Sequence, residues 1–194
     1  MTKGSGTRSG LLWEVERLLK EIVENNKELP QVLVMENVIQ VHSEGENMAN
    51  FQLWIDFLES LGYCSYWQNM EASQYGMAQH RERTIMVSLL GEYYYKFPEP
   101  VKLEKYVDEY LEDKVSEKYY LNNEKTEILL DKLEDKGIIL TDRQTDRQLV
   151  VDFSINEPGI NRIANCITAR YDSGISNRRS EGSCVCERFQ RTED

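Results

Sequence analysis

The sequence lacks the features that mark membrane, zinc-binding and disulfide-stabilised proteins. No run approaches the roughly eighteen apolar residues that a membrane helix needs, and no signal peptide opens the chain. The four cysteines and two histidines show neither a zinc spacing nor a disulfide framework. They are Cys64, Cys166, Cys184, Cys186, His42 and His80. We therefore expect a cytoplasmic protein with reduced thiols, no bound metal and no membrane partner.

Positive charge is also scarce. The chain has 23 Lys and Arg residues against 34 Asp and Glu, a formal net charge of −11. This balance by itself argues against contact with DNA phosphates. The acid is concentrated between Glu104 and Asp135, whereas Arg162 to Arg179 holds four arginines against one acid, Asp172. Local patches set such contacts, so DNA binding remains open.

The apolar pattern of the first half predicts alternating helices and strands. Leu11–Val23 and Met48–Leu61 have helical periodicity. Gln31–Val38 is the mostly apolar strand expected of a covered parallel sheet, and Tyr63–Met70 and Arg83–Leu90 are further strands. This order predicts an α/β layer with an incomplete sheet.

The composition changes after Pro98 and Pro100, so we expect one part over 1–98 and another over 99–194. The second part is predicted to be a small irregular α+β region. Its expected elements are short helical pieces in Lys102–Lys118, a helix over Glu124–Leu133, and strands at Leu149–Phe153 and Cys166–Tyr171. Thr141-Asp142-Arg143-Gln144 repeats at once as residues 145–148, which indicates a tolerated loop insertion.

The triplet Glu36-Asn37-Val38 is the first candidate site. Four apolar residues, Val32 to Met35, precede a carboxylate at the C-terminal end of a strand, where ligands bind in open α/β sheets. The alternative is an acid that caps a helix on a surface loop.

Arg81 and Arg83 are the second candidate. They are two residues apart at the N-terminal end of a predicted strand, so their side chains point to the same side. Two guanidinium groups there suit an anion, or a carbonyl oxygen beside a phosphate. The alternative is a solvated pair neutralised by Glu82 and nearby acids.

Taken in order, these segments resemble the DNA (cytosine-5) methyltransferase family. Thr7-Arg8-Ser9-Gly10-Leu11-Leu12-Trp13 resembles its fifth motif and Glu36-Asn37-Val38 its sixth. Asn69-Met70-Glu71-Ala72 and Tyr75-Gly76-x-x-Gln79-x-Arg81-x-Arg83 resemble its eighth. Order and spacing agree over Gly6–Leu90. Ala78 departs from the family, which usually has proline before the glutamine, and this should loosen the turn.

The resemblance implies a fold and a reaction. The fold is the second half of a Rossmann-like methyltransferase sheet over 1–98, followed by a partial target-recognition region over 99–194. A cytosine of double-stranded DNA is flipped out, a cysteine thiolate attacks carbon 6, and S-adenosylmethionine supplies the methyl group for carbon 5. Glu36 would hydrogen-bond ring nitrogen 3 and the exocyclic amine, which requires a raised pKa.

The resemblance also implies roles for further residues. Arg83 would hold the carbonyl oxygen of the base and a phosphate, and Arg81 would support the catalytic loop. Leu11 matches a position that touches the cofactor. The residues expected to contact DNA are Arg8, Ser9, Asn37, Val38, Gln79, Arg170, Arg178 and Arg179.

Two motifs of the family do not occur in these residues: the Phe-x-Gly-x-Gly cofactor loop and the Pro-Cys-Gln nucleophile. Three hypotheses follow. The chain is a split subunit or a piece of a longer enzyme of restriction-modification or phage origin, completed by an N-terminal half. Alternatively it is a non-catalytic DNA-binding remnant, or a degraded reading frame, which the duplicated tetrapeptide slightly favours. In each case we expect the isolated chain to be inactive.

Overall fold

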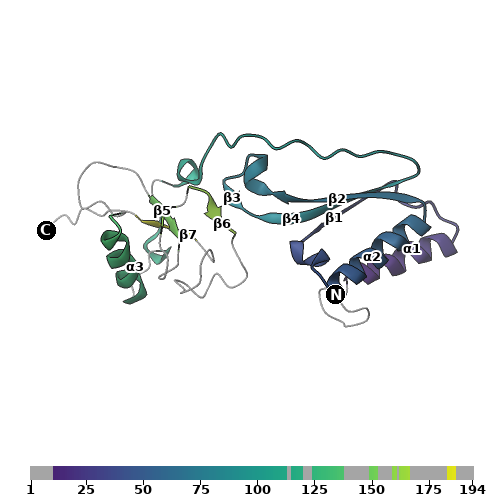
Figure 1. Cartoon of the computed structure of the whole chain (residues 1–194), viewed down its shortest axis with the longest axis horizontal. Coiled ribbons are helices and arrows are strands. Elements are labelled where there is room, and N and C mark those ends of the chain that lie inside the picture. Colours follow the sequence, from purple (N-terminus) through teal and green to yellow (C-terminus); the bar gives the residue numbers. More distant parts are fainter. Residues whose placement is uncertain are drawn as a thin grey trace. The chain divides into compact units, whose positions relative to one another are not determined.

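The computed structural model describes residues 11–112, 115–119, 124–137, 149–152, 159–160, 162–166 and 183–186 (Figure 1). The chain divides into two compact units. The first consists of Met1–Glu71 and Glu82–Glu99, and the second of Ala72–Arg81 and Pro100–Asp194. Their assignment to a catalytic and a recognition region stays a prediction.

The first unit is built on a three-stranded sheet in the order β1-β4-β2. The strands are β1 (Val32–Asn37), β4 (Glu82–Leu90) and β2 (Tyr63–Glu71). β4 pairs antiparallel with both neighbours, so the expected parallel pairing is wrong. β1 and β2 do run the same way, as a helical crossover requires, but β4 is inserted between them and reverses each pairing.

Two helices cover one face of this sheet: α1 (Leu11–Glu24) and α2 (Glu46–Ser60) (Figure 1). The 3-10 turn η2 (Ile39–His42) links β1 to α2. α1 is followed by Asn26 at φ 52°, and α2 by Gly62 at φ 90°. Both residue types accept this left-handed conformation, which ends a helix.

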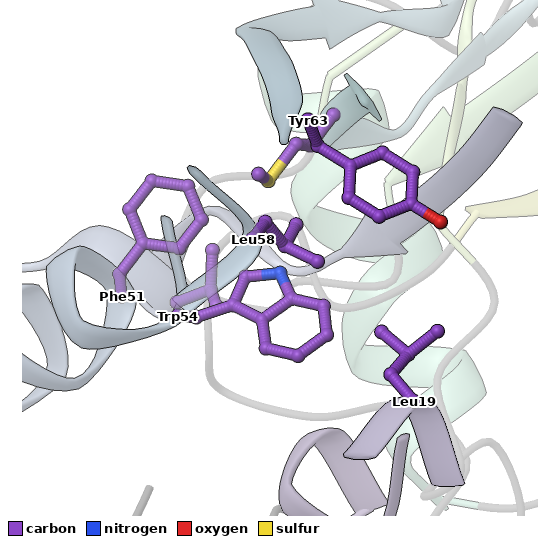
Figure 2. Close-up of a cluster of buried hydrophobic side chains, with 7 residues drawn as sticks. Leu19, Phe51, Trp54, Leu58 and Tyr63 are labelled. Atoms are coloured by element: carbon purple, nitrogen blue, oxygen red, sulfur yellow. The ribbon is translucent and has the colours of Figure 1, made fainter. Parts of the chain in front are cut away.

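The core of the first unit lies between these helices and the sheet. Figure 2 shows Leu19 of α1 gathered with side chains of α2 and with Tyr63 of β2. The buried cluster is Leu19, Val41, Phe51, Trp54, Leu58, Tyr63 and Met86. The Tyr63 hydroxyl donates to the Pro30 carbonyl at 2.6 Å, so the one polar group of this ring is satisfied.

The opposite face of β1 is not covered. Val32 and Val34 are 53% and 69% exposed, which contradicts the expectation of a strand covered on both faces. Among the residues that the structure describes, β1 also has a neighbouring strand on one side only. β1 therefore presents both an apolar face and an open edge.

Within the described residues, the second unit has two small sheets. β3 (Gln79–His80) pairs parallel with β6 (Ala164–Asn165), and β5 (Leu149–Asp152) pairs antiparallel with β7 (Ser183–Cys186). Its helical elements are η3 (Ala72–Tyr75), η4 (Val107–Tyr110), η5 (Glu117–Tyr119) and α3 (Glu124–Asp135). α3 buries Leu129 and Leu133. β6 ends at Asn165, before the strand expected over Cys166–Tyr171, and Cys166 itself is not in a strand. Residues 167–171 and 141–148 lie outside the described residues.

Cys64, Cys166 and Cys184 are each partly buried. No helix in the described ranges is long and apolar enough to span a membrane. In those same ranges, no group of three or more His, Cys, Asp or Glu side chains is arranged to hold a metal ion.

Candidate functional site

An ion pair joins the two candidate segments of the first unit. Arg83 Nε lies 3.2 Å from Glu36 Oε1, with the side chains 22% and 53% exposed. Glu36 is aligned with Ile85 across the strands, and Arg83 is aligned with Met70. The two therefore meet diagonally, a reach that a long arginine side chain can make.

The pair lies on the face of the sheet opposite α1 and α2. Side chains alternate along β1, so Glu36 shares the face of exposed Val32 and Val34. Arg83 Nη1 also donates to the Glu82 carbonyl at 2.7 Å. The guanidinium is thus held by a backbone acceptor and a carboxylate, with both charged groups close to solvent.

A row of polar residues crosses the sheet beside the ion pair, on the helix-covered face. Asn37, Thr84 and Asn69 are aligned across β1, β4 and β2. Thr84 is fully buried, and its hydroxyl donates to Asn69 Oδ1 at 2.9 Å. The Asn37 side-chain oxygen accepts from the Val38 amide at 2.9 Å, which turns the chain from β1 into η2.

His42, the last residue of η2, contacts the same row of polar residues. Its Nε2 lies 2.9 Å from Asn69 Oδ1, and its ring lies 4.7 Å from that of Trp67 and 5.9 Å from that of Phe51. The sequence showed no zinc spacing at His42, and no role beyond its place in a strand was predicted for Thr84. The available signal was a small polar residue directly after Arg83, at the start of an otherwise apolar strand.

The second unit holds two other predicted residues. Gln79 lies in β3 and is aligned with Ala164 of β6. Arg81 Nη1 donates to Cys166 Sγ at 3.6 Å. The structure thus brings Glu36 and Arg83 together, while the convergence of Arg81 with them stays a prediction.

Of the remaining predicted residues, one begins α1, one follows β1, and the others lie outside the residues that the structure describes. Leu11 is the first residue of α1 and is 67% exposed, and Val38 is 46% exposed. Arg8, Ser9, Arg170, Arg178 and Arg179 lie outside the described residues.

Comparison with known proteins identifies the family to which this chain belongs. The family model described as C-5 cytosine-specific DNA methylase matches residues 2–181. Since this match covers most of the 194 residues, the chain belongs to the family of C-5 cytosine-specific DNA methylases.

Two curated relatives show what the chain is similar to. The orphan methyltransferase M.SssI of Spiroplasma monobiae is 43% identical over 124 residues, covering 63% of this chain and 31% of the relative. The type II methyltransferase M2.ScrFI of Lactococcus lactis subsp. cremoris is 40% identical over 120 residues, covering 61% and 31%. The match thus spans about a third of each relative. Among solved structures, Entamoeba histolytica methyltransferase EhMeth aligns with a TM-score of 0.49 at 19% identity, covering 63% of this chain and 36% of that one.

Proposed function

We propose that this chain supplies the cytosine pocket and part of the DNA-recognition surface of a restriction-modification DNA cytosine-5 methyltransferase. The observation that carries the proposal is the Glu36–Arg83 pair, 3.2 Å apart on neighbouring strands of a chain in this family. A carboxyl group and a guanidinium side by side can satisfy both the donor and the acceptor groups on the edge of a flipped cytosine.

The two side chains have complementary tasks. A protonated Glu36 carboxyl donates to ring nitrogen 3 and accepts from the exocyclic amine of cytosine. The Arg83 guanidinium donates to the carbonyl oxygen of the base and to an adjacent phosphate. Glu36 then stabilises the charge that develops on the ring when a thiolate adds to carbon 6. We propose Arg81 as the support for this arrangement.

The nucleophile and most of the cofactor site come from elsewhere in the enzyme. None of the four cysteines stands in a Pro-Cys-Gln triplet. S-adenosylmethionine supplies the methyl group when bound, and Leu11 offers its carbon atoms one exposed apolar contact. An apolar side chain provides no hydrogen bond, so Leu11 cannot hold the cofactor alone. We therefore propose a complementary N-terminal methyltransferase half as the partner.

Double-stranded DNA is the proposed substrate. Asn37 and Val38 would shape the wall of the pocket beside Glu36, and Gln79 would approach the DNA from the loop before Arg81. Arg8, Ser9, Arg170, Arg178 and Arg179 complete the proposed contacts. These arginines supply local positive charge to a chain whose net charge is −11.

The test is binding to a duplex that carries one mismatched cytosine, since extruding an unpaired base costs less free energy. A set of duplexes with varied flanking bases is titrated with the chain, and with the chain plus the N-terminal part of M.SssI. Glu36→Ala, which removes both hydrogen-bonding groups, should weaken binding to the mismatched duplexes, whereas Glu82→Ala, on an exposed acid of β4, should not. Equal binding by both variants would contradict the proposal that Glu36 contacts the base.

A non-catalytic DNA-binding remnant is the second candidate, favoured by the absence of Pro-Cys-Gln from these residues. The same titration, followed by an assay of methyl transfer from labelled S-adenosylmethionine, separates the two. A remnant binds the mismatched duplex, yet no N-terminal half produces methyl transfer to it. A degraded reading frame gives neither Glu36-dependent binding nor a cooperative thermal transition.

A further inference from the structure

Asn69 is the meeting point of two hydrogen bonds from different elements. Its Oδ1 accepts from the Thr84 hydroxyl of β4 and lies at the same distance, 2.9 Å, from His42 Nε2 of η2. An amide oxygen can only accept, so both partners must donate, and His42 carries a proton on Nε2. Thr84 is fully buried, where a lost hydrogen bond is not replaced by water.

These bonds close a ring of contacts around Glu36-Asn37-Val38. The Asn37 side chain accepts from the Val38 amide and bends the chain into η2. His42 ends η2 and is held by the Trp67 ring and by Asn69. Thr84 completes the ring, because it is hydrogen-bonded to Asn69 and is aligned with Asn37 on β1. The segment that carries Glu36 is therefore fixed at both its strand end and its η2 end.

The same ring fixes Arg83, because Arg83 and Thr84 are consecutive in β4. The hydrogen bond of Thr84 sets β4 against β2 at this point, and Arg83 reaches Glu36 from there. We propose that Asn69, through Thr84 and His42, is a positioning residue that holds Glu36 and Arg83 in register for the base. This inference rests on the proposed function for its purpose, while the positioning itself is measurable without DNA.

The experiment measures the Arg83 Nε–H signal of the full chain by 15N–1H NMR. Asn69→Leu and Thr84→Val remove the hydrogen bonds at nearly constant volume, and we expect solvent exchange of this proton to rise about tenfold, the scale of one net hydrogen bond. Asn69→Asp keeps both acceptor positions and Thr84→Ser keeps the hydroxyl, so these variants should retain the slow exchange of the wild-type chain.

A matched control lies in the same two strands. Ser65 and Ser88 are aligned on β2 and β4, and their hydroxyl oxygens are 2.8 Å apart. Ser88→Ala removes this cross-strand bond away from the ion pair and should leave the Arg83 signal unchanged, even if the melting temperature falls. An equal effect of Ser88→Ala, or none from Thr84→Val and Asn69→Leu, overturns the inference.

The mismatched-duplex titration then separates this inference from the proposed function. If the wild-type chain with its N-terminal half binds no duplex, the proposed function fails, while the NMR result still decides the positioning. If the wild-type chain binds and Thr84→Val binds equally well despite a mobile Arg83, the positioning has no role in recognition and the inference is wrong.

Discussion

Arg83 reaches Glu36 across the β1–β4 pairing although neither residue is the other's aligned partner. The carboxylate and the guanidinium are therefore in contact before any ligand arrives. A base that uses both groups must replace this ion pair with hydrogen bonds of its own. The exposure of both side chains keeps the cost of that exchange low.

The first prediction concerns the contribution of this pair to stability. Glu36→Gln should change the free energy of unfolding by no more than about 1 kcal/mol, because the carboxylate is half exposed and solvent screens the interaction. Urea denaturation of the two proteins measures the difference. A loss several times larger would mean that Glu36 is a structural residue, and its effect on DNA binding could not then be assigned to the base.

The second prediction concerns activity. The 194-residue chain alone should transfer no methyl group from labelled S-adenosylmethionine to cytosine-containing duplexes, because it has no Pro-Cys-Gln nucleophile. Incorporation of label by the purified chain, above that of a Glu36→Gln preparation, would show that another group supplies the nucleophile.

The third prediction concerns the open edge of β1. In the described part of the chain β1 has a neighbouring strand on one side only, and its open edge beside exposed Val32 and Val34 favours addition of a further strand. We expect self-association of the isolated chain, or a marked rise in melting temperature with an N-terminal methyltransferase half. Sedimentation velocity and thermal melting, with and without that half, measure both.

Val34→Lys tests the cause, since a lysine on an edge strand opposes strand addition. It should reduce the association, whereas Leu53→Lys, on an exposed position of α2, should not. The prediction is wrong if the wild-type chain is a monodisperse monomer and its melting temperature does not change when the N-terminal half is added.

The fourth prediction concerns the core. Leu58→Ala should lower the free energy of unfolding by about 2–5 kcal/mol, because Leu58 is 1% exposed and its removal leaves a cavity against the sheet. Leu53→Ala on the same helix is the matched control at 57% exposure. It should cost well under half as much. Similar losses for the two variants would contradict the assignment of the buried face of α2.

The fifth prediction concerns alkaline pH. Burial raises the pKa of Tyr63 above its usual value of 10.0, so the folded chain keeps this proton where the unfolded chain loses it. The resulting stability is fully present below pH 10.0 and is lost as the pH rises through the higher folded pKa. Tyr63→Phe should flatten this decline in urea denaturation series. An unchanged decline would assign it to other groups.

The helices and strands of the first unit followed closely from local sequence signals. The predicted helix Leu11–Val23 ends one residue short of α1, and Gly62 ends α2 as its conformational freedom suggested. One predicted strand ends just after Asn37 and another begins at Arg83, which placed Glu36 and Arg83 at one end of the sheet. Short-range periodicity and stop signals were sufficient for these features.

Strand order and the polar row could not be derived in the same way. The insertion of β4 between β1 and β2 depends on long-range pairing, which leaves no periodic signal in either strand. His42 and Asn69 are 27 residues apart, so their contact is set by the sheet register. β3 and β6 have two residues each, too few for a pattern to show.

The assignment of Ala72–Arg81 to the second unit has a practical consequence for protein engineering. The chain passes between the units three times, at residues 71–72, 81–82 and 99–100. A single cut after residue 99 would strip β3 of its partner strand β6. Exchange of the second unit between relatives therefore needs a two-segment graft, in which residues 72–81 are transferred together with the C-terminal part.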